Sequence, residues 1–147
     1  MNMVISDGQK KKKIFVIVGP TAVGKTAAGI VLAQKIHGEI ISCDSMQVYK
    51  EVSIASNKPD GEELKRVPHH LIGIVSVDQK FDVAAFRSLA QEKIDEVLLR
   101  GNVPIIVGGT GMYLKGLLDG IFEEKGSSDQ IRKDLEKEAR DNGSEGL

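Results

Sequence analysis

A glycine-rich segment near the start of the sequence has the residue types and spacing of a phosphate-binding loop. Its residues are Gly19, Pro20, Thr21, Ala22, Val23, Gly24, Lys25 and Thr26, which match Gly-x-x-x-x-Gly-Lys-Thr. The glycines let successive N–H groups turn toward phosphate oxygens, Lys25 can neutralise phosphate charge, and the Thr26 hydroxyl can bind Mg²⁺. We therefore predict that a diphosphate or triphosphate group binds here. Kinases, NTPases and other transferases share this loop, so it does not name the reaction.

Two further polar residues follow other apolar runs of the chain. Asp44 comes just after a run at 40–42, and Thr110 stands among glycines after a run at 103–107. If both runs are parallel strands of one sheet, their carboxyl ends face the same crevice as the loop. Asp44 could then be a general base, a Mg²⁺ ligand or a binder of a substrate hydroxyl or amine. The alternative for each residue is that it caps a following helix.

The apolar pattern predicts the elements that would position these residues. Continuous runs rich in β-branched residues predict buried strands at 14–18, 40–42 and 103–107. Apolar residues at helical spacing predict helices at 25–37 and 81–99, and a further helix should start near Met112. We expect an α/β fold of the P-loop NTPase-like kind, in three layers around a mainly parallel sheet, with a right-handed crossover in its first unit.

The composition narrows the class of protein. The chain has 147 residues, the size of one domain, and its net charge of -1 gives no global positive field for nucleic acid. The single cysteine, Cys43, excludes an internal disulfide and fits a reducing, cytoplasmic compartment. No apolar run approaches the roughly 20 residues that span a bilayer, so we expect no membrane association.

The two ends of the chain differ from the predicted core at 14–122. The lysine-rich residues 1–13 are expected to form a flexible basic leader, because no signal-peptide pattern follows them. Residues 123–147 are mostly polar and predict a partial helical insertion, which needs a partner surface. The abrupt end of the sequence indicates a fragment of a longer protein. The pair His69-His70 is expected to be structural, because neighbours in a strand point to opposite faces and cannot easily share a metal ion.

Four stretches together resemble the tRNA dimethylallyltransferase family, also called tRNA isopentenyltransferases. They are Gly-Pro-Thr-Ala-Val-Gly-Lys-Thr at 19–26, Asp-Ser-Met-Gln-Val-Tyr at 44–49, Val-Pro-His-His-Leu-Ile at 67–72 and Val-Gly-Gly-Thr-Gly-Met-Tyr at 107–113. The resemblance covers about residues 14–142, and four motifs in the family's order are far more specific than the loop alone. The family transfers a dimethylallyl group from its diphosphate to the exocyclic N6 amine of an adenosine beside the tRNA anticodon.

The resemblance implies a role for each matching residue. The 19–26 loop would hold the diphosphate of the prenyl donor with Mg²⁺, Asp44 would take the proton from the adenine amine, and Thr110 would bind the oxygen that bridges carbon and diphosphate. The residues implied to bind adenine or tRNA are Asp44, Ser45, Met46, Gln47, Thr110 and Arg132. The implied partners are tRNA and dimethylallyl diphosphate, and we expect a monomer.

The sequence also departs from the family. After Tyr49 the family pattern resembles Arg-Gly-Met-Asp-Ile-Gly-Thr-Ala-Lys-Pro, whereas residues 50–59 read Lys-Glu-Val-Ser-Ile-Ala-Ser-Asn-Lys-Pro. Family members continue for about as many residues again, so we expect this chain alone to have weak or no activity on tRNA. Three other functions stay open: a small-molecule kinase of the nucleotide or shikimate type, an adenylate isopentenyltransferase, and a non-catalytic phosphate-binding regulatory domain.

Overall fold

A computed structural model describes residues 2–7, 9–52, 58–120, 137 and 140 of the chain. Its five strands lie side by side in the order β1-β2-β5-β3-β4. The strands are β1 (Asn2–Asp7), β2 (Gln9–Val18), β3 (Gly38–Cys43), β4 (His69–His70) and β5 (Val103–Gly108). The helices are α1 (Lys25–Ile36), α2 (Gly61–Arg66), α3 (Val83–Leu99) and α4 (Gly111–Asp119).

Four of these strands, β2, β5, β3 and β4, are mutually parallel, which confirms the predicted α/β fold with a mainly parallel sheet. Each predicted strand and helix is present within a residue or two of its expected bounds, apart from β2, which starts five residues earlier. The strand order adds something the sequence did not indicate. Strand β5 lies between β2 and β3, so the unit β2-α1-β3 skips one position in the sheet.

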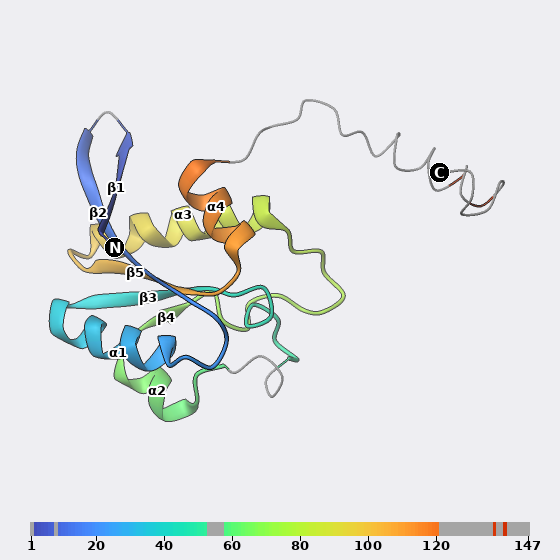
Figure 1. The fold of residues 1–147 in the computed structure, drawn as a ribbon, viewed down its shortest axis with the longest axis horizontal. Helices are drawn as coiled ribbons and strands as arrows, with labels where there is room; N and C mark the ends of the chain where they lie inside the picture. The colour runs from blue at the N-terminus through green and yellow to red at the C-terminus, as the bar shows by residue number, and fades with distance from the viewer. Residues whose placement is uncertain (1, 8, 53–57, 121–136, 138–139, 141–147) are drawn as a thin grey trace.

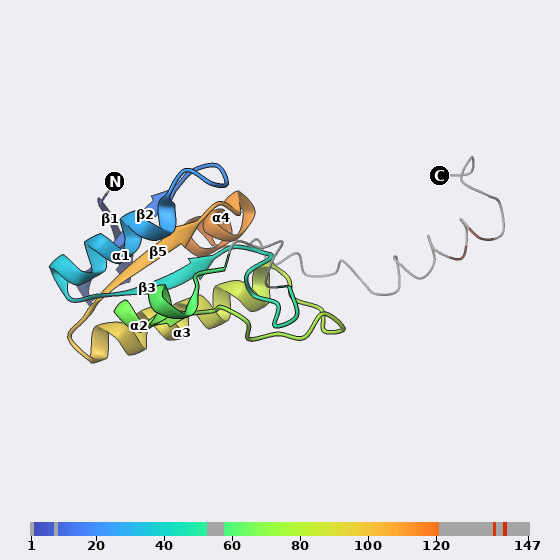
Figure 2. The same ribbon diagram turned by 90° about the horizontal axis from the view of Figure 1, so that it is seen from below.

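Helices cover both faces of the sheet and make the three layers. Figures 1 and 2 show α1 and α2 on one face and α3 and α4 on the other. Successive residues of a strand point to opposite faces of the sheet. Ile40 and Ile105 pack in the core on the α1 side, and Ile41 and Ile106 pack in the core on the α3 side. This explains why the inner strands read as unbroken apolar runs.

The N-terminal segment differs from its expected form. Strand β1 pairs antiparallel with the first part of β2, from Asn2 opposite Phe15 to Asp7 opposite Gln9. Residues 2–7 and 9–13 are therefore strand residues and not the flexible leader that the lysine run predicts. Backbone groups make the ladder, so a run of lysines does not forbid it, and charged residues are common on edge strands.

Three inner strands end at the same level of the sheet. Val18 of β2 is opposite Gly108 of β5, and Gly108 is opposite Cys43 of β3. The approach at this point is very close, because a Cβ atom on Gly108 would lie 2.0 Å from the Cys43 carbonyl oxygen. Only glycine fits there, and the residues after these three strand ends are thereby brought together.

The predicted helical insertion at 123–147, with Arg132, lies outside the described residues except for positions 137 and 140. In the part of the chain that is described, no helix combines the length and apolarity needed to cross a membrane.

Candidate active site

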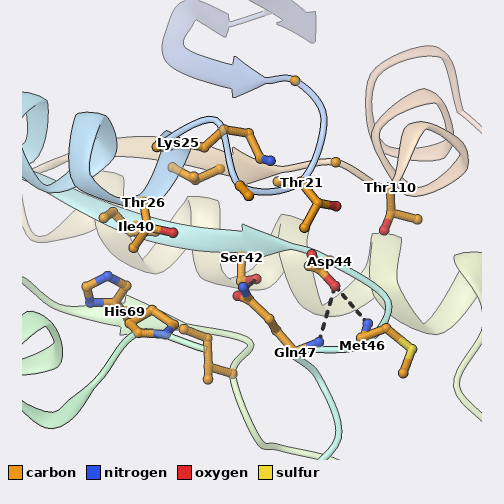
Figure 3. A pocket seen from close by; sticks show the side chains of 18 of the residues that line it. Thr21, Lys25, Thr26, Ile40, Ser42, Asp44, Met46, Gln47, His69 and Thr110 are labelled. Carbon is orange, nitrogen blue, oxygen red and sulfur yellow. Dashed lines mark hydrogen bonds between the residues drawn. The ribbon is translucent and has the colours of Figure 1, made fainter. Parts of the chain in front are cut away.

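A cleft of about 590 Å³ opens at the carboxyl edge of the parallel strands (Figure 3). Its walls include the glycine-rich loop at 19–26, the turn at 44–47 and the segment 107–110. The loop follows β2, the turn follows β3, and the segment contains the end of β5. Of the loop residues only Val23 does not line it. The structure therefore gathers in one cleft all the site residues predicted from the sequence, apart from Val23 and the undescribed Arg132.

The loop has the backbone form that binds anions. Ala22 and Gly24 both have left-handed conformations, with φ angles of 65° and 83°, and Gly24 is the N-cap of α1. The first N–H groups of a helix have no partner within the helix, so they are available to an anion in the cleft. The Lys25 ammonium folds back over the loop and donates to the Pro20 carbonyl oxygen at 2.6 Å.

Asp44 stabilises its own turn. Its Oδ1 accepts hydrogen bonds from the N–H groups of Met46 at 2.8 Å and Gln47 at 3.3 Å. Residues 45–48 form a turn and not a helix, so the alternative of a helix cap is wrong for Asp44. The carboxylate is held by one oxygen in the cleft wall, and Figure 3 shows Met46 and Gln47 on one side of it and Thr21 and Thr110 on the other.

Thr110 occupies the N-cap position of α4, but its hydroxyl makes no capping hydrogen bond. Instead Oγ1 accepts the backbone N–H of Ser45 at 2.9 Å and donates to the Ser45 hydroxyl at 3.3 Å. The Thr110 N–H also donates to the Cys43 carbonyl oxygen at 3.2 Å. The hydroxyl is thus tied to the residue after Asp44, which brings a carboxylate and a hydroxyl into one rigid arrangement.

Ser42 belongs to the site, although the sequence analysis did not single it out. It is 4% exposed, and its hydroxyl donates to the Gln47 side-chain oxygen at 2.9 Å. The bond orients the Gln47 carboxamide in the cleft wall. Alternation could have revealed it, because Ile40 and Ser42 of β3 and Asp44, just after the strand, occupy alternate positions and all line the cleft.

The two neighbouring histidines point to opposite faces, as expected. His69 lines the cleft; its Nδ1 donates to the Val67 carbonyl oxygen at 2.9 Å, and burial lowers the pKa of His69. His70 contacts the Glu39 carboxylate at 2.6 Å, away from the cleft. The described residues contain no cluster of three or more His, Cys, Asp or Glu that could hold a metal ion. A cation here could be bound by the Thr26 hydroxyl or the Asp44 carboxylate, together with oxygens of the ligand.

Known proteins with similar sequences are tRNA dimethylallyltransferases. The enzyme of Exiguobacterium sibiricum is 48% identical over 138 residues, and that of Alkaliphilus oremlandii is 47% identical over 136 residues. These alignments cover 93% and 92% of this chain but 44% of each relative. The chain therefore spans less than half the length of the curated relatives it matches.

Solved structures agree with these sequence matches. The full-length tRNA isopentenylpyrophosphate transferase of Bacillus halodurans superposes with a TM-score of 0.73 at 41% identity, over 88% of this chain and 43% of that one. A eukaryotic dimethylallyltransferase acting on tRNA also gives a TM-score of 0.73, at 39% identity, over 84% of this chain and 31% of that one. The IPP transferase family matches residues 47–147. By its sequence and its fold, the chain belongs to the IPP transferase family.

Proposed function

We propose that this chain forms the prenyl-donor and acceptor-base site of a tRNA dimethylallyltransferase. The reaction transfers a dimethylallyl group from dimethylallyl diphosphate to the N6 amine of an adenosine beside the tRNA anticodon. The observation that supports it most strongly is the common end of β2, β5 and β3, which places the anion-binding loop, Thr110 and Asp44 around one cleft. The resemblance of the chain to enzymes with this activity supports the same conclusion.

In the proposed reaction the N6 lone pair of adenine attacks C1 of the dimethylallyl group. The bond between C1 and the diphosphate oxygen breaks, and its electron pair leaves with the diphosphate. Asp44 accepts the proton that N6 loses, while the Thr110 hydroxyl turns its proton from the Ser45 hydroxyl to the departing oxygen. The adenine amine is a weak nucleophile, since its lone pair is delocalised into the ring, so fixed geometry and a base each contribute.

The loop at 19–26 is the part that would hold the diphosphate. Its N–H groups and the Lys25 ammonium can stabilise the negative charge that grows on the leaving group. Diphosphate binding would draw Lys25 away from Pro20 toward the anion. Mg²⁺ fits the hydroxyl of Thr26 together with diphosphate oxygens, and it would supply further neutralisation of that charge.

The turn at 44–47 would receive the base. Ser45, Met46 and Gln47 surround the carboxylate, and Gln47 has an amide with which to bind a base edge. The target nucleotide would have to leave its stack to reach a cleft of this size. Arg132 is proposed to contact tRNA.

Labelled dimethylallyl diphosphate is the direct test. The full-length gene product should transfer label to tRNA that has an adenosine at this site, and free AMP, ADP and ATP should accept little. Preferred labelling of free nucleotides would instead identify an adenylate isopentenyltransferase. Phosphoryl transfer from ATP to a small molecule, without prenylation, would identify a kinase and refute the proposal.

A further inference from the structure

The turn that contains Asp44 and Gln47 continues into residues 48–50, whose backbone is hydrogen-bonded to residues 73–75. The N–H of Gly73 donates to the Gln47 carbonyl oxygen at 2.8 Å, and the N–H of Ile74 donates to the Val48 carbonyl oxygen at 2.8 Å. The Lys50 N–H in turn donates to the Val75 carbonyl oxygen at 2.8 Å. These bonds fix the outer end of the turn against residues 73–75.

Lys58 holds the other side of this segment. Its Nζ donates to the carbonyl oxygens of Tyr49 and of Lys50, the latter at 3.3 Å. The side chain is half-buried, and it forms no ion pair with any carboxylate of the described residues. Its charge is therefore directed at backbone carbonyl groups, as with basic residues that satisfy the last carbonyls of a helix.

The residues that follow Lys58 form another part of the cleft wall. Pro59 follows it, is buried and lines the cleft, and its ring fixes the φ angle. Asp60 then caps α2, accepting from the N–H groups of Glu62 and Glu63, while Glu63 accepts the Asp60 N–H. Lys58 thus connects the part of the cleft wall that contains Pro59 and Glu63 to the turn that carries Asp44.

We propose that Lys58 is a positioning residue that sets the separation between the Asp44–Gln47 turn and the Pro59–Glu63 wall. It does not line the cleft, and it makes no hydrogen bond to the loop at 19–26. Its loss should therefore impair placement of the acceptor base and the transfer step, and leave diphosphate binding unchanged. This inference rests on the proposed function for its kinetic consequence, but not for its structural one.

Two substitutions of Lys58 and one control test the role. Lys58→Met keeps the length of the side chain and removes the donors, whereas Lys58→Arg keeps charge and donors. Lys65→Met is the control, because Lys65 is exposed on α2 and its side chain bonds, among the described residues, only to Glu62. In the full-length gene product we expect Lys58→Met to lower kcat/KM for tRNA about 10-fold, the scale of a small misplacement of reacting groups. Lys58→Arg should restore most of the loss, and Lys65→Met should show none.

Two measurements without turnover complete the test. Binding of inorganic diphosphate to Lys58→Met, by calorimetry, should stay within about twofold of the unsubstituted chain, since no bond of the loop is lost. Amide hydrogen exchange should accelerate at residues 46–50 and remain unchanged in α1 and β5. Unchanged exchange at 46–50 would overturn the positioning role. So would a loss of diphosphate affinity as large as the loss in kcat/KM. If the unsubstituted protein fails to prenylate tRNA, the proposed function fails, and the exchange result still decides for or against the role of Lys58.

Discussion

The two ends of the sheet each carry a group of polar residues, and the two groups are built in opposite ways. At the carboxyl edge, Asp44, Thr110 and Lys25 bond mainly to nearby backbone or to one neighbour and face an open cleft. At the amino edge, Glu39 is 3% exposed and is surrounded by side-chain partners. The first group can still bind a ligand, while the second is complete within the protein.

In the buried group at the amino edge, both oxygens of the Glu39 carboxylate have two hydrogen-bonding partners each. Glu39 accepts two hydrogen bonds from Arg100, at 3.0 and 2.8 Å, one from Asn102 at 2.8 Å, and contacts His70 at 2.6 Å. The hydrogen bonds from Arg100 above all outweigh burial and lower the pKa of Glu39 from 4.5 to about 2. Substitutions of the cleft residues should therefore lower activity and leave stability nearly unchanged, whereas substitutions in the Glu39 group should do the reverse.

The largest effect is expected from Asp44→Asn. The asparagine oxygen can still accept the N–H groups of Met46 and Gln47, so the turn should be retained. The proton acceptor is lost, however, and prenyl transfer should fall about 10³-fold, within the usual range for general bases. Single-turnover transfer to tRNA measures the rate, and thermal unfolding should show a midpoint close to that of the unsubstituted protein. Undiminished transfer would remove Asp44 from its proposed role as the base.

The next largest effect concerns Glu39 and pH. A carboxyl group whose folded-state pKa is lowered stabilises the fold at pH values above its unfolded pKa, and this contribution disappears as pH falls through the folded value. For Glu39 the window runs from pH 4.5 down to about 2, and the change is about 3 kcal/mol. Denaturant unfolding of the unsubstituted chain should show this loss, and the same titration of Glu39→Gln should be flatter. Identical pH profiles for the two proteins would contradict the importance of the Arg100 bonds.

A third contrast is expected from Lys25→Met. Within the described residues the Lys25 ammonium makes one hydrogen bond, to the Pro20 carbonyl oxygen, so the fold should lose little stability. A charge-assisted hydrogen bond to diphosphate is worth about 2 kcal/mol, so affinity for inorganic diphosphate should fall about 30-fold. Calorimetry measures the affinity, and Lys35→Met, on the same helix but outside the cleft, is the matched control. Equal affinities for the two variants would show that the loop binds diphosphate without Lys25.

Local pattern was enough to predict the inner strands, three of the helices and the cleft residues that follow the strands. The loop at 19–26, Asp44 and Thr110 each follow a continuous apolar strand, and the parallel arrangement of such strands sends their ends to one edge. The strand order was not predictable in this way, because the position of β5 between β2 and β3 depends on contacts between distant segments. The same limitation applies to β1, whose partner is chosen by backbone pairing and not by side-chain periodicity.

Glu39 illustrates the limit for single residues. In sequence it is one more charged residue beside a glycine, and nothing nearby marks it as buried. Its partners lie 31, 61 and 63 residues further along the chain, and only the fold brings them together. Ser42 is intermediate between the cleft residues and Glu39. Alternation along the strand predicts that it shares a side with Asp44, but its bond to Gln47 depends on how the turn folds.

The smallest effect, and the finest test of the contrast, is expected from Ser42→Ala. Ser42 is buried like Glu39, yet its hydroxyl donates to a cleft residue, Gln47. Loss of one neutral hydrogen bond costs about 1 kcal/mol, which can appear either in stability or in substrate binding. If Gln47 binds the acceptor base, KM for tRNA should rise about fivefold while the free energy of unfolding changes by less than about 0.5 kcal/mol. If the free energy of unfolding instead falls by the whole of about 1 kcal/mol and KM is unchanged, Ser42 stabilises the fold, as Glu39 does, and does not act in substrate binding.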